Sequence, residues 1–458
     1  MVPAKKLKIA FVHPDLGIGG AERLVVDAAL GLQEAGHEVI IYTSHCDKTH
    51  CFEEVKNGTL KVEVFGDFLP TDLGKRFFIV FANLRQLYLT AKVVLSGRSK
   101  DKDVFIIDQL STCVPFFKLA NNKVLFYCHF PDQLLAIRTN WIKSLYRIPF
   151  DLLEQFTMYC SDEVVVNSNF TKSMYKKTFK YLQKNPNVIY PCVDTDTETL
   201  INDRDMQIGN LLVGKCPNFY LSINRYERKK NIELAIQAFA KASVENTNLV
   251  VCGGYDPRIH ENVQYLQELT CLCKELDLSY TVNHYSDFIE DSYSVNEIEK
   301  LFGAKVIFLT SISSSLKEFL IQNMQLLLYT PSYEHFGIVP LEAMKYGKPV
   351  LAVNNGGPVE TVVSYQKEDN EKSTTGWLRS ADADEWASAL IESKEVLNQN
   401  PELFKNNGPK RVIELFSRKA MTQEFETNIK LALRHTSNIS IIYVVSIIFA
   451  VLLKVFVF

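Results

Sequence analysis

Short apolar runs alternate with longer segments of helical periodicity along most of the chain. The run at residues 8–13 leads through a glycine-containing loop into a helical pattern at 21–35, and a second apolar run follows at 38–43. This order predicts a β-loop-α-β unit, the building block of parallel sheets. Further buried strands are predicted at residues 104–107, 124–127 and 164–166.

The same alternation restarts in the second half of the chain. A predicted strand at 219–223 precedes a helix at 231–241, and further strands are predicted at 248–252, 305–309, 326–329 and 349–353. A polar stretch at 196–215 separates the two series and is predicted to be a linker. The pattern therefore indicates an α/β protein with two doubly wound, Rossmann-like domains in tandem, at residues 1–195 and 216–410.

The C-terminal segment has a different character. Residues 439–458 are 20 in number, and their only polar side chains are Ser440, Ser446 and Lys454. Twenty helical residues span about 30 Å, the thickness of a bilayer's hydrocarbon core. Basic residues just before the segment favour a body that stays on the cytosolic side. We predict a membrane-embedded tail, with a buried core element as the alternative.

Two other segments, at residues 75–95 and 141–156, carry apolar side chains at helical spacing with basic residues among them. Such stripes are typical of helices that face a protein core. Next to a predicted membrane tail, a membrane-surface face is an equally good interpretation. The sequence leaves the two interpretations open.

Composition narrows the class of protein. The chain has 458 residues, of which 47% are hydrophobic and 22% charged, which excludes global disorder. A net charge of −3 argues against a nucleic-acid binder. Ten cysteines without a repeated spacing do not form a disulfide framework and favour a reducing compartment. The apolar run near the N-terminus is too short for a signal-peptide core.

The glycine-containing loop after the first predicted strand does not fit a dinucleotide-binding fingerprint. That fingerprint needs a third glycine three residues after the second, and Glu22 stands there instead. Gly19 and Gly20 nevertheless lie at a strand-to-helix turn, where bare backbone N–H groups can approach a phosphate or a sugar. A tight turn without a ligand is the simpler interpretation of this loop alone.

The second predicted domain carries a more specific set of charges. Arg225 and Lys230 follow its first strand, where two cations suit a diphosphate. Glu334 lies in the loop after the strand at 326–329, and Glu342 comes eight residues later. Between them, a helix predicted to begin at Phe336, Gly337 and Ile338 would offer unpaired N–H groups to an anion.

These motifs resemble those of retaining glycosyltransferases of the GT-B fold, in the group-4 family with the E-x₇-E motif. The resemblance covers about residues 6–430. It implies two domains that face a cleft, with a C-terminal helix at 411–438 returning toward the N-terminal, acceptor-side domain. The phrases GIGGAERLVVDAALGLQEAGHEV, YCHFPDQLL and EHFGIVPLEAM are similar to mannosyltransferases of dolichol-linked oligosaccharide assembly.

That resemblance implies a donor, an acceptor and a location. The donor is GDP-mannose, and the acceptor is a Man-GlcNAc₂-diphosphate-dolichol that receives α-1,3- and α-1,6-linked mannose. The implied place is the cytosolic face of the endoplasmic reticulum membrane, with other mannosyltransferases of the pathway as possible partners and no nucleic acid. The alternatives are another lipid-directed enzyme, such as one using UDP-N-acetylglucosamine on phosphatidylinositol, and a catalytically dead, membrane-tethered interaction protein.

The resemblance also implies roles for single residues. Arg225 and Lys230 match the diphosphate-binding cations, and Glu342 matches the carboxylate on the donor ribose. Glu334 matches the carboxylate that faces the donor sugar. The remaining matches are the loop closing over the donor and the N-terminal-domain histidine near the transferred sugar, which correspond to Gly19, Gly20 and His129.

This chain departs from the family pattern in two places. Asn231 stands where many members have glycine after the lysine, and the long stretch 287–325 contains an unexplained serine run at 313–315.

The implied substrates also suggest a mechanism. The implied donor and products are all α-linked, which means that the anomeric configuration is retained. No good nucleophile is visible on the N-terminal side, where His129 stands. Departure and attack on the same face of the sugar are therefore preferred to a double displacement. Because Arg225, Lys230 and the helix start can stabilise the leaving diphosphate, no metal or other cofactor is implied.

Overall fold

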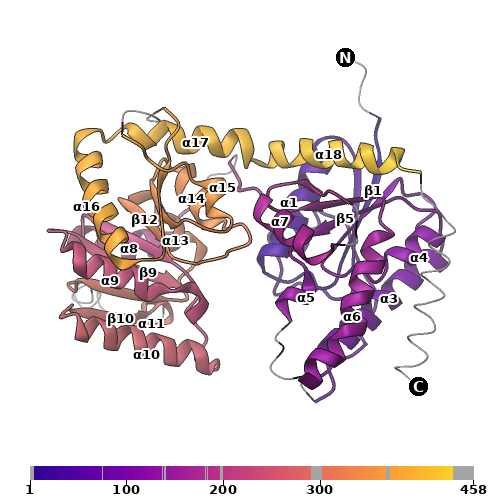
Figure 1. Cartoon of the computed structure of the whole chain (residues 1–458), viewed down its shortest axis with the longest axis horizontal. Helices are drawn as coiled ribbons and strands as arrows, with labels where there is room; N and C mark the ends of the chain where they lie inside the picture. Colours follow the sequence, from indigo (N-terminus) through magenta and orange to yellow (C-terminus); the bar gives the residue numbers. More distant parts are fainter. Residues whose placement is uncertain are drawn as a thin grey trace. The chain divides into compact units, whose positions relative to one another are not determined.

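The computed structural model describes residues 5–74, 76–136, 138, 141–180, 182, 184–195, 200–289, 302–367 and 372–436. The predicted membrane tail at 439–458 lies outside them. The chain divides into two compact units (Figure 1). The first contains the chain up to Cys192 and again from Arg418 onward, and the second is Val193–Ser417.

The first unit is built on a seven-stranded sheet of order β3-β2-β1-β4-β5-β6-β7, in which neighbouring strands are parallel. Its strands are β1 (Lys8–His13), β2 (Glu38–Thr43), β3 (Val62–Val64), β4 (Val104–Asp108), β5 (Val124–Cys128), β6 (Glu163–Val166) and β7 (Asn187–Val188). Its helices are α1 (Gly20–Glu34), α2 (Glu53–Lys56), α3 (Phe78–Leu95), α4 (Val114–Leu119), α5 (Asp132–Leu135), α6 (Trp141–Tyr159), α7 (Asn169–Thr178) and α18 (Arg418–Arg434).

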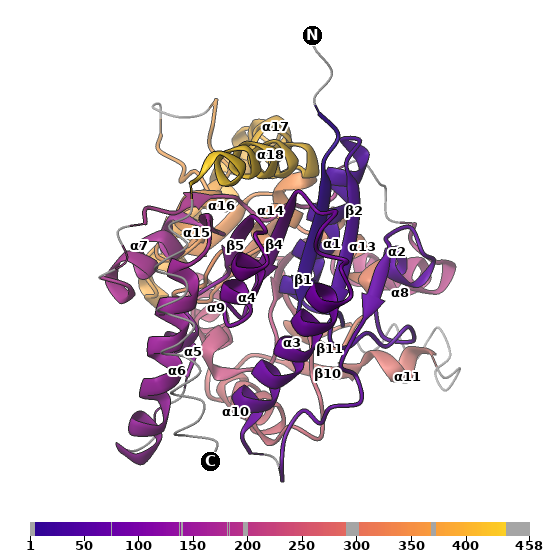
Figure 2. The ribbon, with the colours of Figure 1, turned by 90° about the vertical axis from the view of Figure 1, so that its right-hand side faces the viewer.

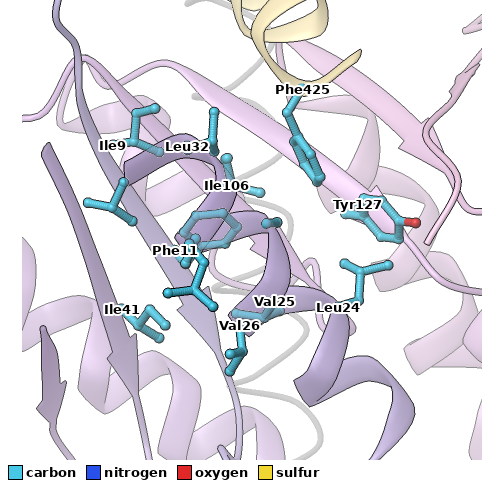
Figure 3. Close-up of a cluster of buried hydrophobic side chains, with 14 of the residues drawn as sticks. Ile9, Phe11, Leu24, Val25, Val26, Leu32, Ile41, Ile106, Tyr127 and Phe425 are labelled. Carbon is cyan, nitrogen blue, oxygen red and sulfur yellow. The ribbon is translucent and has the colours of Figure 1, made fainter. Parts of the chain in front are cut away.

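Helices cover both faces of this sheet because its strands are apolar on both sides. On one face, Phe11 and Tyr127 pack with α1 and with Phe425 of α18, whose ring centroid lies 6.5 Å from that of Phe11 (Figure 3). Val12 and Phe126 point to the opposite face, where α3, α4 and α7 contribute to the core. Figure 2 shows α1 and α3 beside the strands of this unit.

The second unit has its own seven-stranded sheet, of order β10-β11-β9-β8-β12-β13-β14, again with parallel neighbours. Its strands are β8 (Phe219–Ile223), β9 (Asn248–Gly253), β10 (Tyr280–His284), β11 (Val306–Thr310), β12 (Leu326–Tyr329), β13 (Val350–Val353) and β14 (Gly376–Arg379). Its helices are α8 (Asp203–Lys215), the 3₁₀ turn η1 (Arg228–Lys230), α9 (Ile232–Ala242), α10 (His260–Glu275), α11 (Tyr285–Ile289), α13 (Ser314–Asn323), α14 (Val339–Lys345), α15 (Pro358–Thr361), α16 (Ala383–Gln399) and α17 (Leu403–Leu415). The structure thus confirms the two doubly wound parallel sheets that the sequence predicted.

Two predicted boundaries are wrong. Residues 203–215 of the expected linker form α8, which buries Ile208 and Leu212 and begins with Asn202 accepting a hydrogen bond from the backbone N–H of Asp205. Only a few apolar positions of this helix face the core, so its composition resembles that of a linker. The expected helix at 411–438 is also two helices, because α17 ends at Leu415 and α18 begins at Arg418 in the other unit.

Candidate active site

In the first unit, three titratable side chains meet at the carboxyl edge of the sheet. His13 ends β1, Asp108 ends β4, and His129 directly follows β5. Nδ1 of His13 lies 2.8 and 2.9 Å from the two carboxylate oxygens of Asp108, and Nε2 of His129 lies 2.8 Å from Oδ2 of the same carboxylate. His13 and Asp108 are buried, whereas the His129 side chain is 21% exposed. His129 therefore presents the accessible end of the cluster.

In this cluster, His13 and Asp108 each stabilise the charged form of the other. Burial alone would lower the pKa of His13, but the Asp108 carboxylate raises it to about 10. Burial alone would raise the pKa of Asp108, but the nearby His13 lowers it to about 2. At neutral pH the cluster therefore holds a buried imidazolium and a carboxylate that accepts hydrogen bonds from both histidines.

The glycine loop is tied to the same cluster through Glu22, in the first turn of α1. Oε1 of Glu22 lies 3.7 Å from Nε2 of His13, and a Cβ atom at Gly19 would collide with the Glu22 carboxylate. Gly20 has open space around its Cα. The Glu22 carboxylate thus folds against Gly19, a contact that the sequence did not reveal.

In the second unit, Lys230 and Glu334 form an ion pair, with Nζ 2.6 Å from Oε2. Lys230 ends η1, after β8, and Glu334 lies in the loop after β12. The hydroxyl of Thr330 donates a hydrogen bond of 2.7 Å to the backbone carbonyl of Lys230, which fastens η1 to the end of β12. Two residues that are 104 positions apart in the sequence are thereby brought into contact.

Arg225 lies closer to solvent than Lys230. Its side chain is 62% exposed, and Nη1 lies 3.0 Å from Oε1 of Glu227. Asn231, the residue that departs from the family pattern, has φ of 51°, in the left-handed region. Glycine adopts this conformation most easily and asparagine tolerates it better than most residues, so the substitution preserves the turn that ends η1.

The helix start between the two glutamates is not where the sequence placed it. α14 begins at Val339, with Ile338 as its N-cap, so Phe336 and Gly337 belong to the preceding loop. Gly337 has φ of 82°, and a Cβ there would lie 2.9 Å from the Tyr329 hydroxyl. Proline at the second helical position is compatible with the later start, because its missing N–H is unpaired there anyway.

The Glu334 loop rests against the turn that follows β13. The backbone N–H of Gly357 donates a hydrogen bond of 2.8 Å to the Glu334 carbonyl. A Cβ at Gly356 would lie 2.6 Å from that same carbonyl oxygen. Two adjacent glycines therefore allow the backbones to approach closely and hold Glu334 in place.

Glu342 has a partner that the sequence reasoning missed. Nζ of Lys317, on α13, lies 2.8 Å from Oε1 of Glu342. Burial acts to lower the pKa of Lys317, but the Glu342 carboxylate raises it above its usual value. Oε2 of Glu342 is buried and has no hydrogen-bond partner among the described residues. That oxygen is an unsatisfied hydrogen-bond acceptor.

The serine run at 313–315 has a structural explanation. The Ser313 hydroxyl accepts a hydrogen bond from the backbone N–H of Leu316 at the start of α13 and donates one of 2.6 Å to Asp205 of α8. The Ser315 hydroxyl accepts one from the backbone N–H of Asn202. The run caps α13 and joins it to α8. Residues 290–301 of the same stretch lie outside the described residues.

The two apolar, basic segments differ in how many of their side chains are buried. Within the 75–95 segment, Phe78–Leu95 form α3, which buries Leu89 and Val93 in the core. α3 is long and apolar enough to cross a membrane, a test that core helices of globular proteins also pass. In α6, the side chain of Trp141 is 75% exposed, and other large apolar side chains are exposed along the helix, namely Ile142, Leu145, Ile148, Leu152 and Phe156. This face is uncovered among the described residues.

Comparisons with known proteins agree with this architecture. Residues 18–197 match the family described as Glycosyltransferase Family 4, and residues 203–411 match Glycosyl transferases group 1. Sucrose-phosphate synthase from Thermosynechococcus elongatus has the same fold, with a TM-score of 0.64, 18% identity, and coverage of 92% of this chain and 98% of that one. These matches define the chain as a GT-B glycosyltransferase.

Relatives with much higher sequence identity show which family of GT-B glycosyltransferases this chain belongs to. The alpha-1,3/1,6-mannosyltransferase ALG2 of Saccharomyces cerevisiae is 57% identical over 94% of this chain and 86% of its own length. The ALG2 of Eremothecium gossypii is 58% identical over 92% of this chain and 83% of its own. This chain belongs to the ALG2 family of alpha-1,3/1,6-mannosyltransferases.

Proposed function

We propose that the protein transfers mannose from GDP-mannose to Man-GlcNAc₂-diphosphate-dolichol, forming α-1,3 and α-1,6 linkages in N-glycan precursor assembly. The observation that carries the chemistry is the joint placement of Lys230, Glu334, Glu342 and Arg225 around one end of the second sheet. Membership of the ALG2 family supports the choice of sugar and linkages.

The donor binds in the second unit. Lys230 and Arg225 bind the diphosphate, assisted by the backbone of the loop at Phe336, Gly337 and Ile338. Glu342 uses its unpartnered Oε2 to accept a hydrogen bond from a ribose hydroxyl, while Lys317 holds Oε1. Cations are suited to the first task and carboxylates to the second.

Donor binding changes the role of Glu334. Without donor, Glu334 pairs with Lys230 in a partly exposed ion pair. The diphosphate competes for the lysine, which releases the carboxylate toward the mannosyl ring. Its negative charge then stabilises the positive charge that develops on the sugar during transfer.

The transfer retains configuration. The bond between the anomeric carbon and the diphosphate oxygen breaks, and the electron pair leaves with GDP. The acceptor hydroxyl attacks the oxocarbenium-like carbon from the same face, and its proton passes to the departing phosphate oxygen. Arg225 and Lys230 stabilise that leaving group, so this step requires no metal. In the first unit, His129 contacts a sugar hydroxyl, and Gly19 and Gly20 form the loop that closes over the donor.

The acceptor lipid places the reaction at the cytosolic face of the endoplasmic reticulum membrane. Residues 439–458 anchor the chain, and the exposed apolar face of α6 lies against the lipid surface. Both views show the N-terminal end of α6 projecting from the first unit (Figures 1 and 2). This arrangement brings the first unit to a lipid-borne acceptor.

A donor panel tests this proposal. Purified full-length protein in detergent is mixed with a synthetic lipid-linked Man-GlcNAc₂ acceptor and either GDP-mannose, GDP-glucose or UDP-N-acetylglucosamine. We expect product only with GDP-mannose. Transfer from UDP-N-acetylglucosamine to phosphatidylinositol, without transfer of mannose, would establish the competing activity instead.

A further inference from the structure

The imidazole of His129 has only one ring nitrogen free for a ligand. Its Nε2 lies 2.8 Å from Oδ2 of Asp108. A carboxylate can only accept hydrogen bonds, so Nε2 carries the hydrogen and donates it. No hydrogen bond to Nδ1 is found within the described ranges of the chain. In the neutral ring, Nδ1 therefore carries the lone pair.

Asp108 can hold this arrangement because it is itself fixed. Its carboxylate is buried, and both its oxygens lie within hydrogen-bond distance of Nδ1 of His13. A buried carboxylate facing only a neutral histidine would tend to take up a proton and could then no longer be a pure acceptor. His13 is fully buried between Asp108 and Glu22, and it supplies the compensating positive charge.

We propose that Asp108 is a positioning residue for mannosyl transfer, and that it fixes His129 in the Nε2–H tautomer so that Nδ1 accepts a hydrogen bond from a sugar hydroxyl. His13 is the buried cation that keeps Asp108 ionised. This inference rests on the proposed function, in which His129 contacts the sugar. It assigns roles to two buried residues, His13 and Asp108.

A spectroscopic measurement on the wild-type chain tests the tautomer directly. The chain has nine histidines, which are labelled with ¹³C and ¹⁵N. The His129 signals are assigned by their loss in His129→Ala, and solid-state spectra are recorded in lipid at neutral pH. We expect a protonated Nε2 and an unprotonated Nδ1 for His129. An unprotonated Nε2 would overturn the proposal, whatever activity the protein has.

Kinetics of Asp108→Asn supply the second test. The oxygen of the new amide suits the protonated Nδ1 of His13, which turns the NH₂ group toward Nε2 of His129. That contact demands the opposite tautomer and leaves a hydrogen on Nδ1. We expect kcat to fall roughly ten- to a thousandfold, with little change in KM for GDP-mannose. Unlike the ribose, the mannosyl ring gains positive charge during transfer, so a hydrogen bond to its hydroxyl strengthens mainly in the transition state.

A double mutant separates positioning from general damage. In a His129→Ala background, Asp108→Asn should lower kcat little further, because the side chain that it positions is gone. Asp67→Asn is the matched control, since Asp67 pairs with His45 at an exposed place in the same unit. Full additivity of the two substitutions, or wild-type kcat in folded Asp108→Asn, would contradict the proposal.

The outcome also separates this inference from the proposed function. If wild-type protein transfers no mannose, the proposed function is wrong. If wild type transfers mannose and Asp108→Asn does so equally well, only the positioning role is wrong. Should Asp108→Asn fail to fold, the tautomer measured in wild type decides alone.

Discussion

The two units place charged residues at the same kind of sheet edge but hold them in different ways. In the first unit, Asp108 and His13 are buried, and Asp108 accepts hydrogen bonds from two histidines. In the second, Lys230 pairs with Glu334 and Lys317 pairs with Glu342, and all four side chains remain partly accessible.

This difference suits the two units to different tasks, namely ligand binding in the second unit and side-chain positioning in the first. The Lys230 and Glu334 side chains keep 14% and 26% of their surface exposed, so an incoming diphosphate can reach the lysine and compete with Glu334 for it. Removing one partner of a buried pair costs about 3–5 kcal/mol, so the arrangement around Asp108 does not rearrange on binding. In the proposed function, the ion pairs of the second unit exchange partners with the donor, whereas the hydrogen bonds around Asp108 in the first unit keep His129 in one orientation.

The largest expected effect is on turnover, from Glu334→Gln. The substitution removes the negative charge that stabilises the developing positive charge on the sugar. We expect kcat to fall roughly ten- to a thousandfold, from the loss of one electrostatic contact worth about 1.4–4 kcal/mol. Steady-state kinetics and the melting temperature are measured together. Glu392→Gln, which disrupts the Arg379 pair elsewhere in the unit, is the control and should keep its kcat.

That prediction fails if Glu334→Gln retains the wild-type kcat. It also fails if activity is lost only in proportion to unfolding, because Glu334 would then be a structural residue of the loop.

A slightly smaller loss is expected when a phosphate-binding cation is removed. Lys230→Ala should lower kcat/KM for GDP-mannose by about 10- to 150-fold, the equivalent of one charge-assisted hydrogen bond of about 1.5–3 kcal/mol. Arg225→Ala should lose less, because its side chain is largely exposed. Lys241→Ala removes an exposed lysine that pairs with Asp384 and serves as the control. An unchanged kcat/KM for GDP-mannose in Lys230→Ala would show that the diphosphate does not bind at Lys230.

Glu342→Gln should act on binding rather than on turnover. The ribose hydroxyls do not change during the reaction, so the lost hydrogen bond affects ground state and transition state equally. We expect KM for GDP-mannose to rise about tenfold, the equivalent of about 1.4 kcal/mol, with kcat preserved. Initial rates over a range of donor concentrations separate the two parameters. A fall in kcat with constant KM would reassign Glu342 to catalysis.

The smallest effect is a pH dependence of stability from the first unit. The pKa of His13 is about 10 in the folded protein, above its ordinary value of 6.5. Between pH 6.5 and 8 the unfolded chain loses a proton that the folded chain keeps, so this contribution to the free energy of unfolding falls as pH rises. One proton gives at most about 1.4 kcal/mol per pH unit. Above pH 8 the half-buried Lys184, whose pKa is lowered to about 8 by burial, acts in the opposite direction.

Denaturant unfolding at several pH values between 6.5 and 8 measures this slope. Fluorescence of the buried Trp377 and Trp386 in a Trp141→Phe variant follows the second unit, and circular dichroism follows the whole chain. We expect the free energy of unfolding to decline with rising pH in the transition that involves the first unit. A free energy for that transition that rises over this interval would contradict the charged state of His13.

Much of the fold could be predicted because buried parallel strands are short apolar runs. The strand predicted at residues 38–43 and the one at 326–329 have the observed bounds. The edge strands of both sheets were missed. β3 and β7 are only three and two residues long. β10 and β14 are five and four residues long, but they mix apolar with polar or charged side chains. α8 was missed because its surface positions are polar, which resembles a linker.

The sequence indicated candidate site residues only where charged residues carry a recognisable spacing. Glu334 and Glu342 stand in such a motif, but Lys317 and Asp108 do not, and they meet their partners only through the fold. Asp108 nevertheless ends an apolar strand, and polar residues in that position lie at the carboxyl edge of a parallel sheet, where ligands bind. That signal could have pointed to Asp108. The contact of Glu22 with Gly19 has no such signal.

The most direct test of the central claim is the mass of the product formed on a lipid-linked acceptor. Wild-type protein and Glu334→Gln are each incubated with GDP-mannose and Man-GlcNAc₂-diphosphate-lipid. The glycans are then released from the lipid, their masses are measured by mass spectrometry, and they are digested with linkage-specific mannosidases. The account predicts that wild type adds two hexoses, one α-1,3-linked and one α-1,6-linked, and that Glu334→Gln adds them far more slowly. An acceptor that remains unchanged with folded wild-type protein, or that gains a sugar of another kind, would contradict it.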